Sequence, residues 1–270
     1  MIEIKLPIEI SDSRLDVFLK IFQLIKTKQN IVLNWEKVQR ISSAGYAVLA
    51  CLFDLIVEHQ ATIKNKNLKK YLKEIPSIKN LLQAQDHKTL PDPDIHNYKS
   101  NNVMLKCSAG SVDINFMNEV LYSLWSGLSE ELFFSSKLIF NELMQNSISH
   151  SGAERYCSYA GRWGDEFHIG VLDMGVTIPA KLEQKYLCNN DIDYLELAFK
   201  DGITTRRHRT GGLGLGHTID ALRNNKGKLT IISRNAQIKK YFMTRKTSKN
   251  LLRYPLNGTW CFTRFKTQGE

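Results

Sequence analysis

The sequence predicts an α/β (α+β) protein built from two units, and three observations support this fold class. Strand and helix patterns alternate over residues 1–84, which favours helices packed on a sheet with some parallel pairing. A polar segment over residues 85–102 contains two prolines, has no apolar period and is predicted to be a linker. A long amphipathic helix, a hairpin and late strands follow over residues 103–270. A chain of 270 residues is long enough for both units.

The first unit is predicted from short apolar runs that alternate with amphipathic stretches. One such stretch places Leu15, Phe18, Leu19, Phe22 and Ile25 on a single helical stripe. The expected strands cover residues 1–10 (interrupted by Pro7), 31–35 and 61–65, and the expected helices cover 14–26, 44–58 and 68–83.

The second unit is predicted to mix helices with strands. Gly164-Asp165 separates two apolar runs and indicates a β-hairpin. Residues 201–212 are polar and without a period, so we expect a mobile loop there. The expected strands cover 103–107, 154–163, 166–172, 228–233, 237–244 and 259–265, and the expected helices cover 112–127, 129–150, 179–200 and 213–223.

Composition narrows the setting in which the protein works. No run is apolar and long enough to cross a bilayer, so we expect no membrane partner, and the N-terminal residues lack the features of a secretory signal. The five cysteines are scattered and form no Cys-x-x-Cys pair, which indicates neither a zinc site nor a disulfide framework. These features predict a protein of the reducing cytoplasm.

The net charge of +10 permits contact with nucleic acid or an anionic surface. Many of the positive residues lie in Lys/Asn-rich stretches such as KNKNLKKYLK and KTSKN, which favours solvated faces over a dedicated site. Contact with nucleic acid therefore ranks last among the functions considered below.

A polar row on the helix over 129–150 is the first candidate for chemistry. Glu142, Asn146 and His150 are four residues apart and share one helix face. Glu142 is suited to take a proton, and the Asn146 amide oxygen is a suitable ligand for Mg²⁺ beside phosphate oxygens. His150 either bonds phosphate or caps the helix end, and an ordinary solvated face is the alternative for all three. The opposite, apolar row comprises Ile139, Phe140, Leu143, Met144 and Ile148.

A second block, DMGVTIP, follows the apolar strand FHIGVLD. Asp173 ends that strand, and its carboxylate is suited to accept a hydrogen bond from an exocyclic amine such as that of adenine. Gly175 can take a positive φ and lets the backbone approach a ligand closely. An ordinary strand-to-turn Asp-x-Gly is the alternative.

A third block is a glycine-rich loop that opens a helix, where backbone amides and the helix end form an anion cradle. Its spacing matches neither a Walker-type loop nor the dinucleotide fingerprint. Arg206, Arg207 and Arg209 precede it and would place cations near a γ-phosphate, unless they form only an exposed basic loop. The residues expected to hold phosphate are Thr210, Gly211, Gly212, Leu213, Gly214, Leu215 and Gly216.

With these blocks, residues 103–270 resemble the GHKL ATPase family of gyrase B, heat-shock chaperones, histidine kinases and MutL. Its N box is matched by Glu142 and Asn146, its G1 box by 173–179, and its G2 box by 211–216. Gly258-Thr259 resembles the pair that meets the adenine-binding aspartate. The resemblance implies an α/β sandwich with a mixed sheet, which binds ATP and Mg²⁺ under a mobile lid.

By matching position, the resemblance implies a role for each residue. Glu142 would be the base, Asn146 the metal ligand, and Asp173 and Thr259 the readers of adenine, while 211–216 would cradle phosphate. One position departs from the pattern, because Thr177 stands where the G1 box usually has a second glycine. Nucleotide binding is therefore expected, and turnover is left open.

Residues 1–84 resemble a STAS domain, the fold of anti-anti-sigma factors, through the order of their elements and the segment RISSAGYAVLA. Signalling members carry a phosphorylated serine where this chain has Ala44. Ser43 is either a substitute acceptor or a structural serine at a helix start.

Three functions follow from this pairing. The first is a nucleotide-controlled signalling switch with ATPase or serine-kinase activity, resembling the anti-sigma kinases that act on separate STAS partners. The second is a non-catalytic ATP/ADP-binding subunit of a larger assembly, and the third is a basic ATPase that acts on nucleic acid. A protein partner is expected in the first two, and the sequence leaves open whether the chain forms a homodimer.

Overall fold

The computed structural model describes residues 1–69, 96–98, 103–109, 128–153, 155–200, 203 and 214–267. The chain divides into two compact units, Met1–His96 and Asn97–Glu270, which are described separately. The helix predicted over 112–127, most of the helix predicted over 68–83, and nearly all of the loop predicted over 201–212 lie outside the described residues. In the described parts of the chain, no helix has the length and apolar character needed to cross a membrane.

The first unit contains a three-stranded parallel sheet in the order β1-β3-β5, as the alternation of strands and helices predicted. Helices α1 and α2 pack against each other, and a second, two-stranded parallel sheet pairs β2 with β4. All five stripe residues of α1 are buried, so its apolar face forms the core. The elements are β1 Ile2–Lys5, β2 Glu9–Ile10, α1 Leu15–Lys26, β3 Ile31–Asn34, β4 Arg40–Ile41, α2 Ser43–Glu58 and β5 Ile63–Lys66.

The start of α2 is held by tight packing. Ser42 Oγ accepts a hydrogen bond from Gly45 N at 3.2 Å, and a Cβ on Gly45 would lie 2.2 Å from Ile10 O. Ser43 begins the helix and is only 1% exposed. The geometry therefore favours the structural alternative for Ser43, because its hydroxyl is closed to a phosphate donor.

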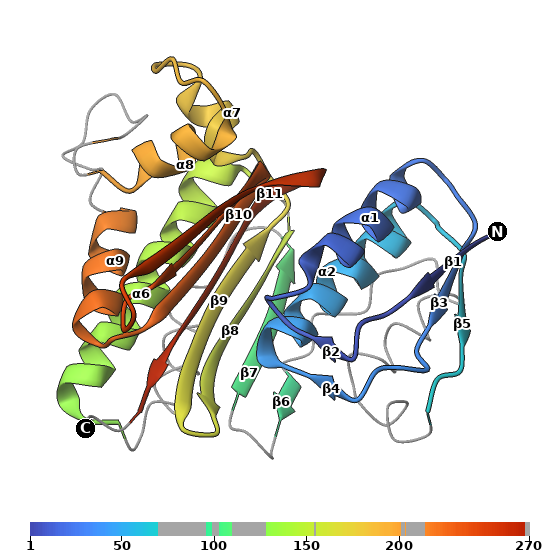
Figure 1. Cartoon of the computed structure of the whole chain (residues 1–270), viewed down its shortest axis with the longest axis horizontal. Helices are drawn as coiled ribbons and strands as arrows, with labels where there is room; N and C mark the ends of the chain where they lie inside the picture. Colours follow the sequence, from blue (N-terminus) through green and yellow to red (C-terminus); the bar gives the residue numbers. More distant parts are fainter. Residues whose placement is uncertain are drawn as a thin grey trace. The chain divides into compact units, whose positions relative to one another are not determined.

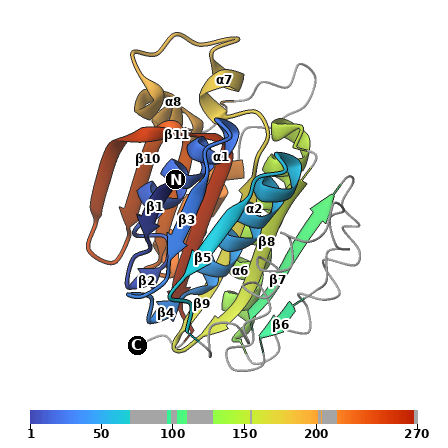
Figure 2. The ribbon, with the colours of Figure 1, turned by 90° about the vertical axis from the view of Figure 1, so that its right-hand side faces the viewer.

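The second unit is a six-stranded sheet in the order β10-β11-β9-β8-β7-β6, with β7 and β6 along one edge (Figure 2). The four pairings described from β10 through β7 are all antiparallel, so the mixed sheet implied by the family resemblance is not found among them. Two of these pairs, β8 with β9 and β10 with β11, are close neighbours in sequence, and antiparallel pairs need no crossover. The strands are β6 His96–Tyr98, β7 Val103–Ala109, β8 Arg155–Trp163, β9 Glu166–Asp173, β10 Lys228–Tyr241 and β11 Lys246–Lys266.

One strand falls where the sequence predicted only a linker. β6 occupies residues 96–98 inside the segment 85–102 and joins the edge of the large sheet. Its residues His96, Asn97 and Tyr98 show no apolar alternation, which explains why a pattern of buried faces did not reveal it.

Helices cover one face of this sheet, and α6 and α9 lie side by side on it (Figure 1). The buried cluster between them draws on Ile139, Phe140, Leu143 and Met144, as predicted for the apolar row of α6. Ile148 was expected in that row but is 39% exposed, because α-helical spacing ends at Asn146 and a π turn follows. The helices are α6 Glu130–Asn146, the π turn η1 Ser147–Ser151, α7 Ile178–Leu182, α8 Asp191–Ala198 and α9 Gly214–Asn224.

Strand β10 folds back on itself. Phe242 N donates to Gly227 O at 2.9 Å, so the residue after β10 lies beside the residue before it. The reversal falls at Arg234, which has a φ of 52° and sits where the register with β11 shifts. Two arms result, 228–233 and 236–241, which fits the two strands that the sequence predicted over 228–233 and 237–244.

Strand β11 is three times as long as expected, because it pairs with both arms. Residues 259–264 pair with the first arm and 246–251 with the second. The sequence predicted a strand only over 259–265, since 246–250 is polar, all of 246–251 is exposed, and the segment therefore shows no alternation.

Candidate functional site

The candidate site is built around Asp173, where three segments of the second unit meet. Asp173 ends β9, directly opposite Thr259 of β11. Its Oδ1 accepts hydrogen bonds from Gly175 N at 3.1 Å and Thr259 N at 3.2 Å. Its Oδ2 accepts one from Ser147 Oγ at 3.2 Å, which comes from the π turn after α6. The structure thus joins Asp173, Gly175 and Thr259, which the sequence singled out, to Ser147, which it did not.

Asp173 is buried, with only 2% of its surface exposed. Burial raises its pKa to about 7, because desolvation of the carboxylate outweighs the hydrogen bonds from Gly175, Thr259, Ser147 and Ser151. No ion pair to Asp173 is found in the described part of the chain, so neutral donors alone support its charge. A buried carboxyl group that has only neutral hydrogen-bond donors around it is suited to recognise a further neutral donor, such as an exocyclic amine.

The raised pKa of Asp173 predicts that stability falls as pH rises. The folded protein binds this proton more tightly than the unfolded chain, whose pKa is 3.8, so unfolding becomes easier between about pH 4 and about pH 7. Relative to Asp173→Asn, the wild type should lose up to about 3 kcal/mol of unfolding free energy between about pH 5 and about pH 8. Urea unfolding of both proteins at the two pH values measures this loss. If the unfolding free energies of the wild type and Asp173→Asn differed by the same amount at both pH values, the burial of the charge would be contradicted.

Two glycines bring the backbone close to Asp173. A Cβ on Gly175 would lie 2.3 Å from Ser151 O, and a Cβ on Gly258 would lie 2.1 Å from Asp173 O. The positive φ that the sequence suggested for Gly175 is found instead at Gly258, whose φ of 108° is a conformation that residues with a side chain rarely adopt. The two glycines therefore let β11 and the π turn close around the carboxyl group.

Replacing Gly258 by alanine should destabilise the second unit strongly, because the new Cβ would overlap Asp173 backbone in a conformation that alanine resists. We expect a loss of about 3 kcal/mol or more in unfolding free energy. Gly164→Ala is the matched control, since Gly164 also has a positive φ of 64° but nothing within 4 Å of its added Cβ. Equal losses in the two variants would show that backbone strain alone, and not the close approach to Asp173, explains the effect.

A hydroxyl network extends the site to α7. Ser233 Oγ contacts Thr259 Oγ1 at 2.9 Å and accepts a hydrogen bond from Ile178 N at 2.9 Å. Thr177, the residue that departs from the family pattern, caps α7 by accepting from Ala180 N at 3.3 Å. Its hydroxyl thus has a local structural role that a glycine at the same position lacks.

Glu142 lies across from α9. His217 Nδ1 is 3.7 Å from Glu142 Oε1, and the two side chains are 42% and 22% exposed. The Nδ1 atom is buried and has no hydrogen-bond partner in the described residues, so Glu142 is the acceptor nearest to it that the structure identifies. The arrangement places an imidazole beside the predicted base, one turn into the helix that the glycine-rich loop opens.

The predicted row Glu142, Asn146 and His150 is only partly formed. Glu142 and Asn146 share a face of α6, but the π turn that begins at Ser147 changes the spacing before residue 150. The His150 side chain lies outside the described residues. The π turn instead directs Ser147 to Asp173, and Ser151 Oγ donates to Ser147 O within the same turn.

Most of the predicted phosphate cradle lies outside the described residues. This applies to Arg206, Arg207, Arg209, Thr210, Gly211, Gly212 and Leu213. Gly214, Leu215 and Gly216 form the first turn of α9, as the sequence predicted for the helix that follows the loop. The first turn of a helix carries unpaired backbone amides, which suits the binding of an anion.

The residues that would contact the base of a nucleotide fit that role. Asp173 offers a buried carboxyl group braced by Gly175 N and Thr259 N, and α9 begins at the loop expected to bind phosphate. Among the described residues, no three His, Cys, Asp or Glu side chains gather as a metal site. The role of Asn146 as a Mg²⁺ ligand beside phosphate oxygens stays a prediction.

Sequence reasoning missed Ser147, Ser151, Ser233 and His217. The π turn that recruits Ser147 and Ser151 has no sequence signal of its own. His217 stood at the end of the glycine-rich block, and its pairing with Glu142 depends on the packing of α6 against α9.

No protein-family model matches the chain, and a search of the curated proteins finds no significant match. The interpretation of the site therefore depends on its residues and their geometry.

Proposed function

We propose that the second unit is a GHKL-type ATP-binding module and that the protein is a nucleotide-controlled regulatory switch. The observation that carries this proposal is the buried Asp173 carboxyl group, braced by Gly175 N and Thr259 N at the end of β9. Burying a carboxyl group that has no ion pair among the described residues costs folding free energy. Recognition of a ligand by this group would explain why the protein tolerates that cost.

The position of the other predicted residues supports the same proposal. Glu142 on α6 and the start of α9 belong to two helices that pack together on the face of the sheet that carries Asp173. In this proposal Asp173 reads the adenine amine, Asn146 holds Mg²⁺ with the phosphates, and the backbone at 211–216 binds phosphate. Bound ATP and Mg²⁺ would supply the phosphoryl group, and Glu142 would accept the proton of the attacking water or hydroxyl.

The first unit, with its parallel sheet and two packed helices, is proposed to be STAS-like and to act as a partner-reading unit. Ala44 replaces the usual phosphoacceptor, and Ser43 is 1% exposed, which favours recognition of nucleotide state over phosphorylation of this unit. Nucleotide controls such a switch only if the partner binds one nucleotide state more tightly than the other.

Calorimetric titration of the whole chain tests nucleotide recognition. We expect Mg·ATP and Mg·ADP to bind with similar stoichiometry and Mg·GTP to bind at least about tenfold more weakly, because guanine presents a carbonyl where adenine presents its amine. Equal affinity for GTP and ATP would contradict the role of Asp173 as a reader of adenine. Absence of heat with all three would contradict the proposal itself.

A non-catalytic binding subunit is the second candidate, and the Glu142–His217 contact favours it over turnover. His217 Nδ1 lies 3.7 Å from the carboxylate oxygen that the proposed base would need for its proton. Phosphate release from Mg·ATP separates the two candidates, since a subunit that only binds would release none.

A further inference from the structure

A row of cations and aromatic rings crosses the face of the large sheet opposite the helices. Side chains on this face alternate with the buried core residues Leu229, Phe265 and Phe167. Directly opposite positions share a face, and Tyr241 pairs with Lys246, Lys228 with Arg264, and Arg264 with His168. We name as the basic row Lys228, Lys239, Tyr241, Lys246, Arg264 and Trp163.

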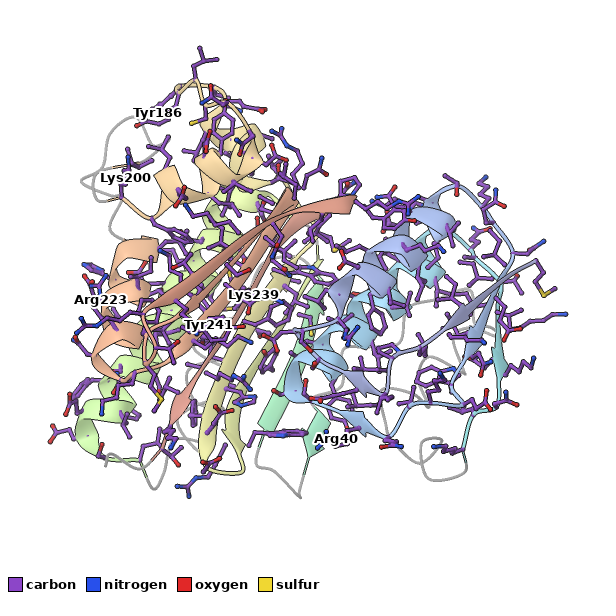
Figure 3. The ribbon with its side chains drawn as sticks, in the orientation of Figure 1. Arg40, Tyr186, Lys200, Arg223, Lys239 and Tyr241 are labelled. Carbon is purple, nitrogen blue, oxygen red and sulfur yellow. The ribbon has the colours of Figure 1, made fainter. Side chains whose placement is uncertain are left out.

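The fold-back of β10 is what assembles the row. It brings Lys228 at one end of the strand over the ring of Tyr241 at the other, with Nζ 5.4 Å from the ring centroid. Lys239 is two residues from Tyr241 and therefore on the same face, and both are labelled side by side in Figure 3. Charges that appear as separate Lys-rich stretches in the sequence thus lie on one surface.

The other end of the row is held by Glu166. Its carboxylate accepts from Arg264 Nη1 at 3.2 Å and contacts His168 Nε2 at 3.1 Å. The hydrogen bond with His168 is the main cause that lowers the pKa of Glu166. The ring of His168 stacks on Trp163, with centroids 6.3 Å apart and planes 20° from parallel. Aromatic rings therefore lie toward both ends of the row, Tyr241 next to Lys246 and Trp163 beside His168.

The row remains accessible to a ligand except at Lys228, which is 9% exposed. Lys246 is exposed, Lys239, Tyr241 and Trp163 are half-buried, and the Arg264 side chain is 40% exposed. The local sequence is strongly basic, since residues 237–254 hold six Lys or Arg and no Asp or Glu. The opposite face of the same hairpin is occupied, because Lys249 pairs with Glu196 of α8 at 2.6 Å.

We propose that the basic row binds single-stranded nucleic acid, with phosphates on Lys239, Lys246 and Arg264 and bases stacked on Tyr241 and Trp163. Cations interleaved with aromatic rings on one sheet face suit a strand with unpaired bases, whereas a duplex keeps its bases stacked inside. Neighbouring strands lie about 4.8 Å apart, so the row extends about 19 Å from Lys246 to His168, enough for several nucleotides. This site is separate from the one around Asp173, which lies on the helix-covered face.

Fluorescence anisotropy of labelled oligothymidylate and oligouridylate with the whole chain, without ATP, tests the proposal. Three cations in contact with phosphate predict a salt slope of about −2.1, or about 18-fold weaker binding from about 50 mM to about 200 mM salt. Lys239→Gln with Lys246→Gln should reduce that slope by about 1.4. Lys137→Gln with Lys200→Gln is the matched control, because both lysines are exposed in the same unit and lie away from the row.

Tyr241 distinguishes nucleic acid from other polyanions. Tyr241→Ala should weaken binding about tenfold and Tyr241→Phe should restore it, since stacking needs the ring and not the hydroxyl. Melting temperatures within a few degrees of wild type show that the variants are folded. The proposal is overturned if the oligonucleotides do not bind, or if the control pair of substitutions weakens binding as much as the pair in the row. It is also overturned if polyglutamate competes while Tyr241→Ala has no effect, which would identify an acidic protein segment as the occupant.

Discussion

Asp173→Asn is expected to remove most of the stabilisation that Mg·ATP gives the protein. At about a hundred times its Kd, ATP should add about 2.7 kcal/mol to the wild type. One oxygen of residue 173 is committed to Gly175 N and Thr259 N, so the asparagine amide group would take the second position and meet the adenine amine donor to donor. A lost hydrogen bond to a charged group costs about 1.5–3 kcal/mol, which leaves about 0.3–1.3 kcal/mol of stabilisation by the ligand.

The same variant should be more stable than the wild type without ligand at about pH 8, because it removes a desolvated charge. Loss of stabilisation by ATP together with a gain in stability without ligand distinguishes a lost ligand contact from misfolding. Asp165→Asn is the control: it makes the same chemical change at an exposed hairpin turn and should leave ATP stabilisation intact. Thermal melts with and without Mg·ATP measure both quantities. Full ATP stabilisation of Asp173→Asn would place the nucleotide elsewhere.

Glu142→Gln has the second largest expected effect, and it concerns turnover. If Glu142 accepts a proton in the reaction, its loss should lower the rate of phosphate release by about 10²–10⁴-fold while the affinity for Mg·ATP stays within about threefold. His217→Gln should change the rate less than Glu142→Gln does, since it removes only the group 3.7 Å from the Glu142 carboxylate and leaves the base in place.

Glu131→Gln is the control for charge, because Glu131 is exposed in the first turn of the same helix. Phosphate release in single-turnover reactions, together with calorimetric affinity, separates binding from chemistry. A rate in Glu142→Gln equal to that of the wild type would exclude Glu142 as the base. No release from any variant, with binding intact, would leave the protein a nucleotide-binding subunit.

The sequence predicted elements well where burial imposes a period. The stripe of α1 and the apolar row of α6 up to Met144 are buried as expected, because one side of each helix faces a core. Prediction failed where the chain is polar on both sides: β6 and the first part of β11 are strands held by backbone pairing, which leaves no mark in side-chain pattern.

The residues of the site could be predicted in part from the sequence, but their assembly could not. Asp173, Gly175 and Thr259 stood out as residue types at strand ends and turns, and the structure places them in contact. Ser147 reaches Asp173 only because α6 ends in a π turn, and Lys228 meets Tyr241 only because β10 reverses at Arg234. Both depend on local backbone geometry that residue spacing does not encode.

The most direct test follows the backbone amides around Asp173 while nucleotide binds. In ¹H–¹⁵N correlation spectra of the isotope-labelled chain, a slowly hydrolysed ATP analogue with Mg²⁺ should shift the amide signals of Gly175 and Thr259 most strongly and with a single saturating affinity. Both amides donate to the carboxyl group that would receive the adenine. Saturable binding that leaves these two signals unchanged, or no binding by the folded protein, would contradict the account.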